Sequence, residues 1–317
     1  MKRKGFTLVE LLVVIAIIAL LMGILMPALN RVKQYAHRVF CGANLSGIGK
    51  AMLVYATDDE FDDYPVFGGP GTDEWSTGGN VPLWDAATEQ LATDDEIATI
   101  TSCLYLLIKY ADVVPEQFVC KGDNAKAFKL SEWNTTAEEE TDVWDFGLCP
   151  SRYCSYSYHS PYGDPARPIT QRNNAGCPLA ADRNPYLDEN AESYLDGPPG
   201  GTSGELPPSW DTTDNIYVDD DKTGNAAPHQ REGQNVLFND SHVNFEKYPN
   251  VGIDNDNIWK HWNSSDTPNA EGKELCPGGE PMAAPTTGAG VGEGEPQSYE
   301  DAYLVNEDQR RIGSLPP

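Results

Sequence analysis

Four side chains in the second half of the chain belong to types that bind divalent metal ions: Asp182, His229, Asp240 and His242. Imidazole nitrogens and carboxylate oxygens bind zinc, and carboxylate and carbonyl oxygens bind calcium. The spacing contains no His-x-His or Cys-x2-Cys pair to support a metal. On residue type alone, one interpretation is nevertheless a metal site of Asp182, His229 and Asp240. The other, which we favour, is that these side chains fix a loop and a hairpin by hydrogen bonds to the backbone.

Catalysis is the rival function for the same side chains, because a histidine and an aspartate with a serine could form a hydrolytic site. The sequence has no Gly-x-Ser-x-Gly elbow, no His-Glu-x2-His motif and no phosphate-binding glycine loop. We therefore expect no enzymatic activity and no obligatory cofactor, with a divalent cation such as calcium as the candidate ligand. A third class is an anchored module that binds carbohydrate through aromatic loops, although such side chains also form local core. The tryptophans concerned are Trp75, Trp84, Trp133, Trp144 and Trp210.

A predicted hairpin positions the histidines. Residues 236–245, VLFNDSHVNF, read as two short strands around an Asn-Asp-Ser turn, because Asn and Asp tolerate left-handed backbone conformations. Ser241 in this turn is expected to be more strained than a glycine. Gly233 lies just before the first strand, and the loop between His229 and Gly233 leads into it.

Charge is divided unequally along the chain. Residues 1–50 hold seven Lys or Arg and one acidic residue, whereas residues 51–317 hold 15 basic and 48 acidic side chains, a net charge of −33. An acidic surface repels nucleic acid and anionic lipid and attracts divalent cations. We therefore expect no nucleic-acid partner.

The N-terminal segment is long enough to cross a membrane. Residues 6–26 contain only two clearly polar side chains, and as a helix they would span roughly 31 Å. A secretory signal has a shorter apolar run of about 7 to 15 residues and a small-residue cleavage site. The basic residues 2–4 place the start of the chain in the cytoplasm and the acidic body outside it. The sequence thus predicts a single-pass protein of the inner membrane.

Glu10 is the unusual residue of this segment, because a carboxylate in apolar surroundings requires a partner. A glutamate near the end of an anchor helix that snorkels to the interface is one explanation. It accounts neither for the Gly5-Phe6 junction nor for the basic leader before it.

Residues 4–15, KGFTLVELLVVI, resemble the class III leader of type IV prepilins and type II secretion pseudopilins. The resemblance implies that a prepilin peptidase cuts after Gly5 and methylates Phe6. It also implies that Glu10 serves assembly with other pilin subunits and that Pro27 kinks the helix. On a helix Glu10 lies about 6 Å along the axis from Phe6, so a staggered neighbour could bring its N-terminal amine to this carboxylate. The implied function is a structural subunit of a type II secretion pseudopilus or type IV pilus-like filament.

The later sequence is similar to pseudopilin-like proteins of planctomycete-type bacteria that carry a C-terminal His-x9-Asp-Gly signature. Residues 41–59 and the segment from His229 to Val243 carry this similarity. The chain departs from the signature, because ten residues separate His229 from Asp240 and Ser241 stands where glycine is expected. The extra residue falls in the loop before Gly233, so the hairpin is expected to be unaffected.

The predicted architecture is an α+β, pilin-like fold in which one long N-terminal helix, from residue 6 to about 57, packs on a small antiparallel sheet with long loops. We expect a second helix at 100–112. Along the long helix, apolar residues recur at Leu29, Val32, Ala36, Val39 and Ala43 and then, in a shifted phase, at Leu45, Ile48, Met52 and Tyr55. Strands are predicted at 117–120, 153–158, 178–182, 235–239 and 242–247.

The expected domain organisation follows the charge and composition along the chain. It consists of a leader at 1–5, a membrane and filament-core helix at 6–27, its extracytoplasmic continuation at 28–58, an acidic domain at 59–264 and a Pro/Gly-rich, weakly ordered tail at 265–317. Within the tail, residues 301–305 are expected to return and dock on the domain.

The seven cysteines permit at most three disulfides within one chain. Cys149 with Cys154 and Cys103 with Cys120 are possible pairs, but spacing does not determine connectivity. The thiols could also all stay reduced.

Overall fold

The computed structural model describes the chain in twelve segments. They are residues 8–59, 61–67, 75–76, 84–85, 90–91, 98–132, 137–147, 150–161, 169–185, 225–253, 258–259 and 304–305.

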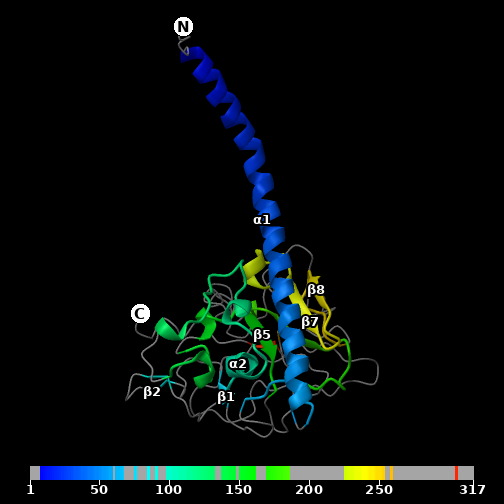
Figure 1. Ribbon diagram of the computed structural model, residues 1–317. Helices are drawn as coiled ribbons and strands as arrows, with labels where there is room; N and C mark the ends of the chain where they lie inside the picture. Colours follow the sequence, from blue (N-terminus) through cyan, green and yellow to red (C-terminus); the bar gives the residue numbers. More distant parts are fainter. Residues whose placement is uncertain are drawn as a thin grey trace, which may run out of the picture.

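Helix α1 (Leu8–Asp58) dominates the molecule (Figure 1). The predicted long helix is confirmed over all its described residues. It continues through Pro27 without a break and curves gently along its N-terminal half. A proline removes one backbone hydrogen bond, which a long helix can accommodate by bending.

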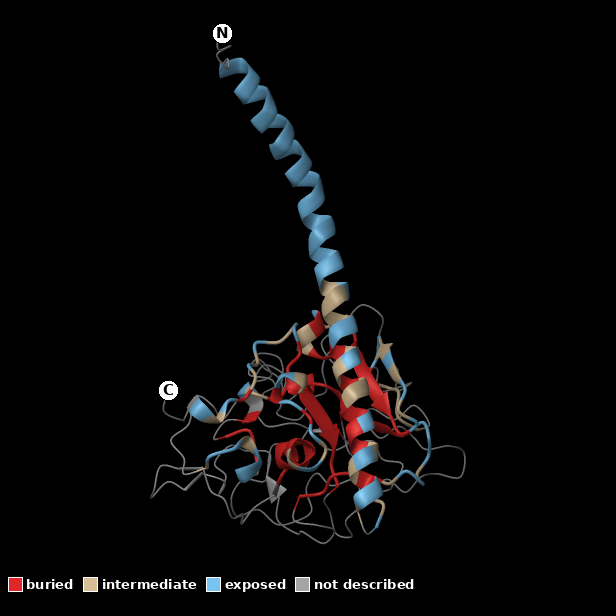
Figure 2. Cartoon of the chain, viewed as in Figure 1, coloured by how far each residue is buried: buried red, intermediate tan, exposed pale blue. Residues whose placement is uncertain are grey.

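The two halves of α1 differ in burial (Figure 2). Every side chain from residue 8 to residue 33 is exposed, whereas a buried stripe in the second half packs on the globular domain. Cys41, Leu45, Ile48 and Met52 form this stripe at helical spacing. Of the predicted earlier stripe, Ala36 is half-buried and Leu29, Val32, Val39 and Ala43 are exposed. Leu29 and Val32 precede the part of the helix that the domain contacts, and Val39 and Ala43 lie off the buried stripe.

A five-stranded antiparallel sheet lies against α1. Its order is β8-β7-β6-β5-β9, and neighbouring strands are antiparallel throughout. This arrangement confirms the α+β class and the predicted hairpin, and it shows that residues 304–305 return to the sheet. The strands are β5 (Tyr156–His159), β6 (Pro178–Asp182), β7 (Gln234–Phe238), β8 (Val243–Glu246) and β9 (Leu304–Val305).

The predicted strand at 117–120 is wrong. Residues Pro115–Phe118 form a 3-10 helix, η1, followed by extended residues without a strand partner among the described residues. Pro115 favours this outcome, because its fixed φ and missing N–H suit the first position of a helix.

The sheet is buried on both faces, as its alternating side chains show. Leu237 of β7 joins the main core with α1 and α2, while Val236 and Phe238 join a smaller cluster on the other face. Ile258 and Trp259 pack on that second face, together with Leu304 of β9. Because side chains alternate along a strand, Asn235 lies on the same face as Leu237, toward α1.

Helix α2 (Ile100–Tyr110) confirms the predicted second helix. A capping box between Thr99 and Ser102 fixes its start. Tyr105 of α2 packs edge-to-face with Phe128 and Phe146 in the main core.

The remaining elements are short. Between α1 and α2 lie β1 (Trp75–Ser76), which pairs in parallel with β4 (Ala98–Thr99), and β2 (Trp84–Asp85), which is antiparallel to β3 (Gln90–Leu91). The other 3-10 helices are η2 (Leu130–Glu132), η3 (Glu140–Asp142), η4 (Pro150–Arg152) and η6 (Ala227–His229).

A glycine permits the close approach of α1 to the sheet. A Cβ at Gly49 would lie 2.8 Å from Leu237 Cδ1, which is closer than carbon atoms can pack. The C-terminal half of α1 therefore lies directly on β7 and β8.

Candidate functional site

The N-terminal half of α1 is an exposed apolar surface. Within the described residues, α1 is the helix that is long and apolar enough to cross a membrane. No charged residue occurs between Glu10 and Arg31, and the side chains of this stretch are exposed. An apolar surface of this size marks a membrane or protein contact.

Glu10 and Pro27 both lie on this surface. Glu10 is in the first turn of α1, where the positive end of the helix dipole favours a carboxylate, and its side chain is exposed. No other acidic residue occurs in α1 before Asp58. The predicted processing residues, Gly5 and Phe6, lie outside the described residues.

The turn of the signature hairpin holds Asp240 and His242. Asp240 Oδ1 accepts a hydrogen bond from the backbone N–H of His242 at 3.1 Å and pairs with the His242 ring, which stacks on Phe238. The backbone N–H bond and the His242 ring lower the pKa of Asp240. Ser241 has a φ of +68°, so the strained turn expected from the missing glycine is present. These contacts support a turn-fixing role for Asp240 and His242.

The loop between His229 and Gly233, where the sequence comparison with the signature predicts an extra residue, contains unusual backbone conformations. Gln230 and Arg231 have φ values of +58° and +56°, two consecutive left-handed residues. Gly233 has a φ of +146°, and any Cβ there would collide with the backbone oxygen of Glu246. Gly233 therefore permits β7 to start beside the end of β8.

His229 is buried beside Asp182, the last residue of β6. The distance from His229 Nε2 to Asp182 Oδ2 is 3.0 Å. Asn235 supports the pair, because its backbone N–H donates to Asp182 Oδ2 at 2.6 Å and its side-chain Nδ2 at 3.0 Å. The alternation of β6 and β7 brings Asp182 and Asn235 to the face that packs on α1.

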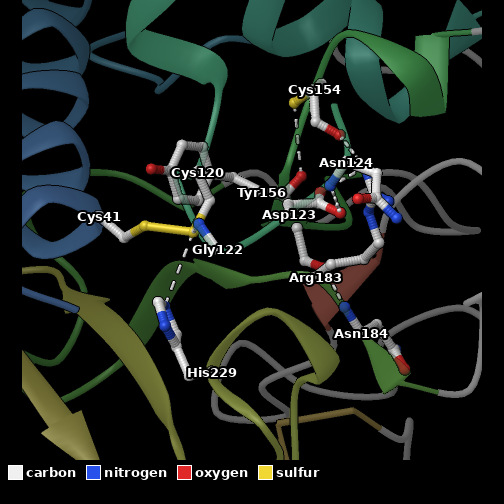
Figure 3. Close-up of polar contacts among 11 residues, drawn as sticks. Cys41, Cys120, Gly122, Asp123, Asn124, Cys154, Tyr156, Arg183, Asn184 and His229 are labelled. Atoms are coloured by element: carbon white, nitrogen blue, oxygen red, sulfur yellow. Dashed lines mark hydrogen bonds and ion pairs between the residues drawn. A yellow bond between two sulfur atoms is a disulfide. The ribbon is translucent and has the colours of Figure 1, made fainter. Parts of the chain in front are cut away.

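A disulfide between Cys41 of α1 and Cys120, two residues after η1, lies next to His229 (Figure 3). Cys120 Sγ is 3.8 Å from His229 Nε2, and the backbone N–H of Gly122 donates to the same sulfur at 3.3 Å. The disulfide, His229 and Asp182 thus form one buried cluster between α1 and the sheet.

The structure brings together two of the three residues of the candidate metal set. It brings Asp182 and His229 together but places Asp240 at the other end of β7, in the exposed turn with His242. The five residues of β7 separate the two ends, so Asp240 does not reach the cluster.

The suggested cysteine pairs also differ from those observed. Cys120 bonds to Cys41 rather than to Cys103, and Cys154 keeps a buried thiol. Cys41 belongs to the buried stripe of α1, and that periodicity was the available sequence signal for its position. Cys120 gave no comparable signal, because its partner lies 79 residues away.

Two further contacts attach the signature loop and its surroundings to α1. Arg38 of α1 forms an ion pair with Glu232, and its guanidinium carbon lies 4.4 Å from the centre of the Phe245 ring of β8. His37, one residue earlier, has a lowered pKa because of burial and the nearby charge of Lys33. These contacts make the middle of α1 part of the site.

A largely buried ion pair lies to the right of the disulfide in Figure 3. Arg183 Nη2 is 3.1 Å from Asp123 Oδ2 and donates to the backbone oxygen of Cys154 at 2.6 Å. The pair joins the loop after Cys120 to the end of β6, directly after Asp182. It was not predicted from the sequence.

A hollow of about 490 Å³ opens near the C-terminal end of α1. Tyr55, Tyr110 and Trp144 contribute aromatic surface, and Asp58 and Asp59 contribute carboxylates. Trp144 is the one loop tryptophan among those considered whose side chain lies within the described residues. Lys109 Nζ lies 3.7 Å from the centre of its ring.

Comparison with known proteins adds one match, and it concerns the N-terminus. Residues 1–26 match the family model described as the prokaryotic N-terminal methylation motif. No curated protein and no solved structure matched the chain. The motif supports a prepilin-like leader at the start of an α+β, pilin-like fold, and with it a pilin-like structural role for the chain.

Proposed function

We propose that this protein is a pilin-like structural subunit, built into a type II secretion pseudopilus or type IV pilus-like filament. One observation carries the proposal: the methylation motif covers the start of a helix whose first half is apolar and exposed. An apolar helix that projects from its own domain can cross a membrane and can also pack beside identical helices in a filament core.

Processing by prepilin peptidase is part of the proposal. The enzyme would cut after Gly5 and methylate Phe6, which removes the three basic residues of the leader and leaves a charged amine at Phe6. Glu10 would then pair with the Phe6 amine of a neighbouring subunit. The helical rise of about 6 Å between Phe6 and Glu10 sets the axial stagger that such a pair requires.

The proposed location is the inner membrane before assembly and the filament afterwards. The basic leader holds the first residues in the cytoplasm, so the acidic domain is extracytoplasmic. In the filament the α1 helices would form the core, and the acidic domains would form the surface.

Mass spectrometry of the mature N-terminus tests this proposal. Cells with prepilin peptidase should yield a chain that begins at methylated Phe6, and cells without it should retain residues 1–5. An intact Met1 in both strains, or a cut near residues 26 to 30, would contradict the processing route.

An anchored binding module is the second candidate, and the hollow beside α1 favours it. Aromatic side chains bind the apolar faces of sugars, and carboxylates accept hydrogen bonds from sugar hydroxyls. Retention of the intact chain on immobilised polysaccharide, lost in Trp144→Ala but kept in Tyr35→Ala, a change at an exposed aromatic of α1 outside the hollow, would support this function. A filament subunit without such a site would pass through the polysaccharide unretained.

A further inference from the structure

Four buried side chains with metal-binding atoms converge between α1 and the sheet. They are Cys41, Cys120, Asp182 and His229, and one potential ligand atom of each lies within 4.8 Å of those of the others. Their exposed fractions are 0%, 0%, 0% and 4%. They come from four separate parts of the chain: α1, the loop after η1, the end of β6 and the end of η6.

The distances are close to those of a tetrahedral zinc site. Bonds of about 2.3 Å to sulfur and 2.0–2.2 Å to nitrogen and oxygen place neighbouring ligand atoms about 3.3–3.8 Å apart. His229 Nε2 lies 3.0 Å from Asp182 Oδ2 and 3.8 Å from Cys120 Sγ. The same ring nitrogen thus lies close to two of its three prospective co-ligands.

The surroundings also suit a metal. Asp182 Oδ1 is buried and has no hydrogen-bond partner within the part of the chain that the structure describes. Asn235 holds the other oxygen of this carboxylate, and the Gly122 N–H donates to the Cys120 sulfur. Such outer contacts orient the ligands of protein metal sites.

Gly122 fixes the approach of the Cys120 loop to His229. A Cβ at this position would collide with the backbone oxygen of Pro228, the residue before His229. The Cys120 loop and η6 therefore lie in direct contact.

We propose that the reduced form of this cluster is a Zn²⁺ site with Cys41, Cys120, Asp182 and His229 as its four ligands. A dithiol reduces the Cys41–Cys120 bond to two thiols and is itself oxidised to a disulfide. Zn²⁺ then replaces both thiol protons, which pass to solvent, and two Zn–S bonds form. The disulfide and the metal site exclude each other, because both use the sulfurs of Cys41 and Cys120. In the oxidised protein the disulfide joins α1 to the domain, and in the reduced protein the bound Zn²⁺ does so.

Metal analysis of the full chain in detergent micelles tests the proposal. The protein is reduced with dithiothreitol, freed of reductant under argon, mixed with Zn²⁺ and dialysed. The reduced chain should retain one Zn²⁺ per chain and the oxidised chain should retain none. X-ray absorption of the zinc-loaded wild type should show two sulfur and two nitrogen or oxygen ligands, a result that needs no variant to fold.

Matched variants assign the ligands. Cys120→Ser should abolish retention, whereas Cys154→Ser, which removes a buried thiol outside the cluster, should leave it unchanged. Asn235→Ala removes only an outer contact and should weaken binding by about 10- to 100-fold. A reduced wild type without zinc, zinc held by four sulfurs, or full retention in Cys120→Ser would each overturn the proposal.

Discussion

Asp182 Oδ2 lies 3.0 Å from His229 Nε2, and both side chains are buried where α1 crosses the sheet. His229 is therefore paired with the end of β6, whereas Asp240 pairs with His242. Asn235 adds two donors to the same carboxylate oxygen. This arrangement joins β6, β7 and the signature loop at one point beneath α1.

Asp182→Ala should lower the free energy of unfolding by about 3–5 kcal/mol, because it leaves a buried histidine and two N–H donors without their acceptor. Urea denaturation of the full chain in detergent measures the change. Asp240→Ala is the matched control: its carboxylate pairs with His242 at the exposed turn, so its loss should cost at most about 1 kcal/mol. Equal losses in the two variants would contradict the assignment of Asp182 as the buried anchor.

Reduction of the Cys41–Cys120 disulfide should destabilise the domain. The bond closes a segment with a sequence separation of 79 residues, for which the loss of chain entropy in the unfolded state corresponds to about 4–5 kcal/mol. Urea midpoints with and without dithiothreitol, in the presence of a chelator, measure the effect. Cys41→Ala should remove the response to dithiothreitol, and Cys154→Ala should preserve it. An identical midpoint in wild-type protein under both conditions would show that the bond does not stabilise the fold.

The hairpin and the disulfide show what the sequence could and could not predict. The hairpin follows from local chemistry, since two apolar strands flank residues that tolerate left-handed conformations. The long helix is equally local, because one uninterrupted apolar run and one helical stripe specify it. By contrast, the pairing of Cys41 with Cys120 and of Asp182 with His229 depends on how distant segments pack, and no spacing along the chain encodes it.

Ser241→Gly should stabilise the hairpin by about 0.5–1 kcal/mol. A left-handed residue other than glycine costs about 1–2 kcal/mol, and the greater freedom of glycine in the unfolded chain offsets part of the gain. Thermal unfolding measures the difference. Asn244→Gly, the same kind of change at an exposed position of β8, should destabilise instead by about 0.5–1 kcal/mol. A loss of stability in Ser241→Gly would show that the serine side chain contributes more than its backbone strain costs.

Asp145 should make stability fall as the pH rises from about 4 to 7. Burial raises the pKa of this carboxyl from 3.8 to about 7, although hydroxyls of Thr99 and Thr101 donate to it at 2.7 and 3.0 Å. Because its pKa is higher in the folded chain, the folded state binds more protons over this range, and stability is lost until the pH passes 7. The loss amounts to at most about 4 kcal/mol.

The comparison of wild type with Asp145→Asn isolates this contribution. Burial also lowers the pKa of His159 from 6.5 to about 3. The folded state therefore binds fewer protons at this residue, and stability decreases as the pH falls below 6.5. Both proteins share the His159 effect, and their difference in unfolding free energy reports Asp145 alone. That difference should favour the Asn variant increasingly from pH 4 to 7 and then stay constant. A difference that does not change with pH would mean that Asp145 is ionised throughout.

Glu10→Ala should leave processing intact and prevent assembly, if the Glu10 carboxylate pairs with the Phe6 amine of a neighbouring subunit. The substitution leaves the Gly5-Phe6 junction unchanged, so the mature N-terminus should still be methylated Phe6. Loss of the pair should reduce the amount of protein in sheared filaments by about tenfold or more. A tenfold change corresponds to about 1.4 kcal/mol in the free energy of subunit association. Val9→Ala, a change at an exposed apolar neighbour in the same turn, should assemble normally. Unimpaired assembly of Glu10→Ala with normal processing would refute the pairing, because the neighbour's amine would then need no carboxylate at this position.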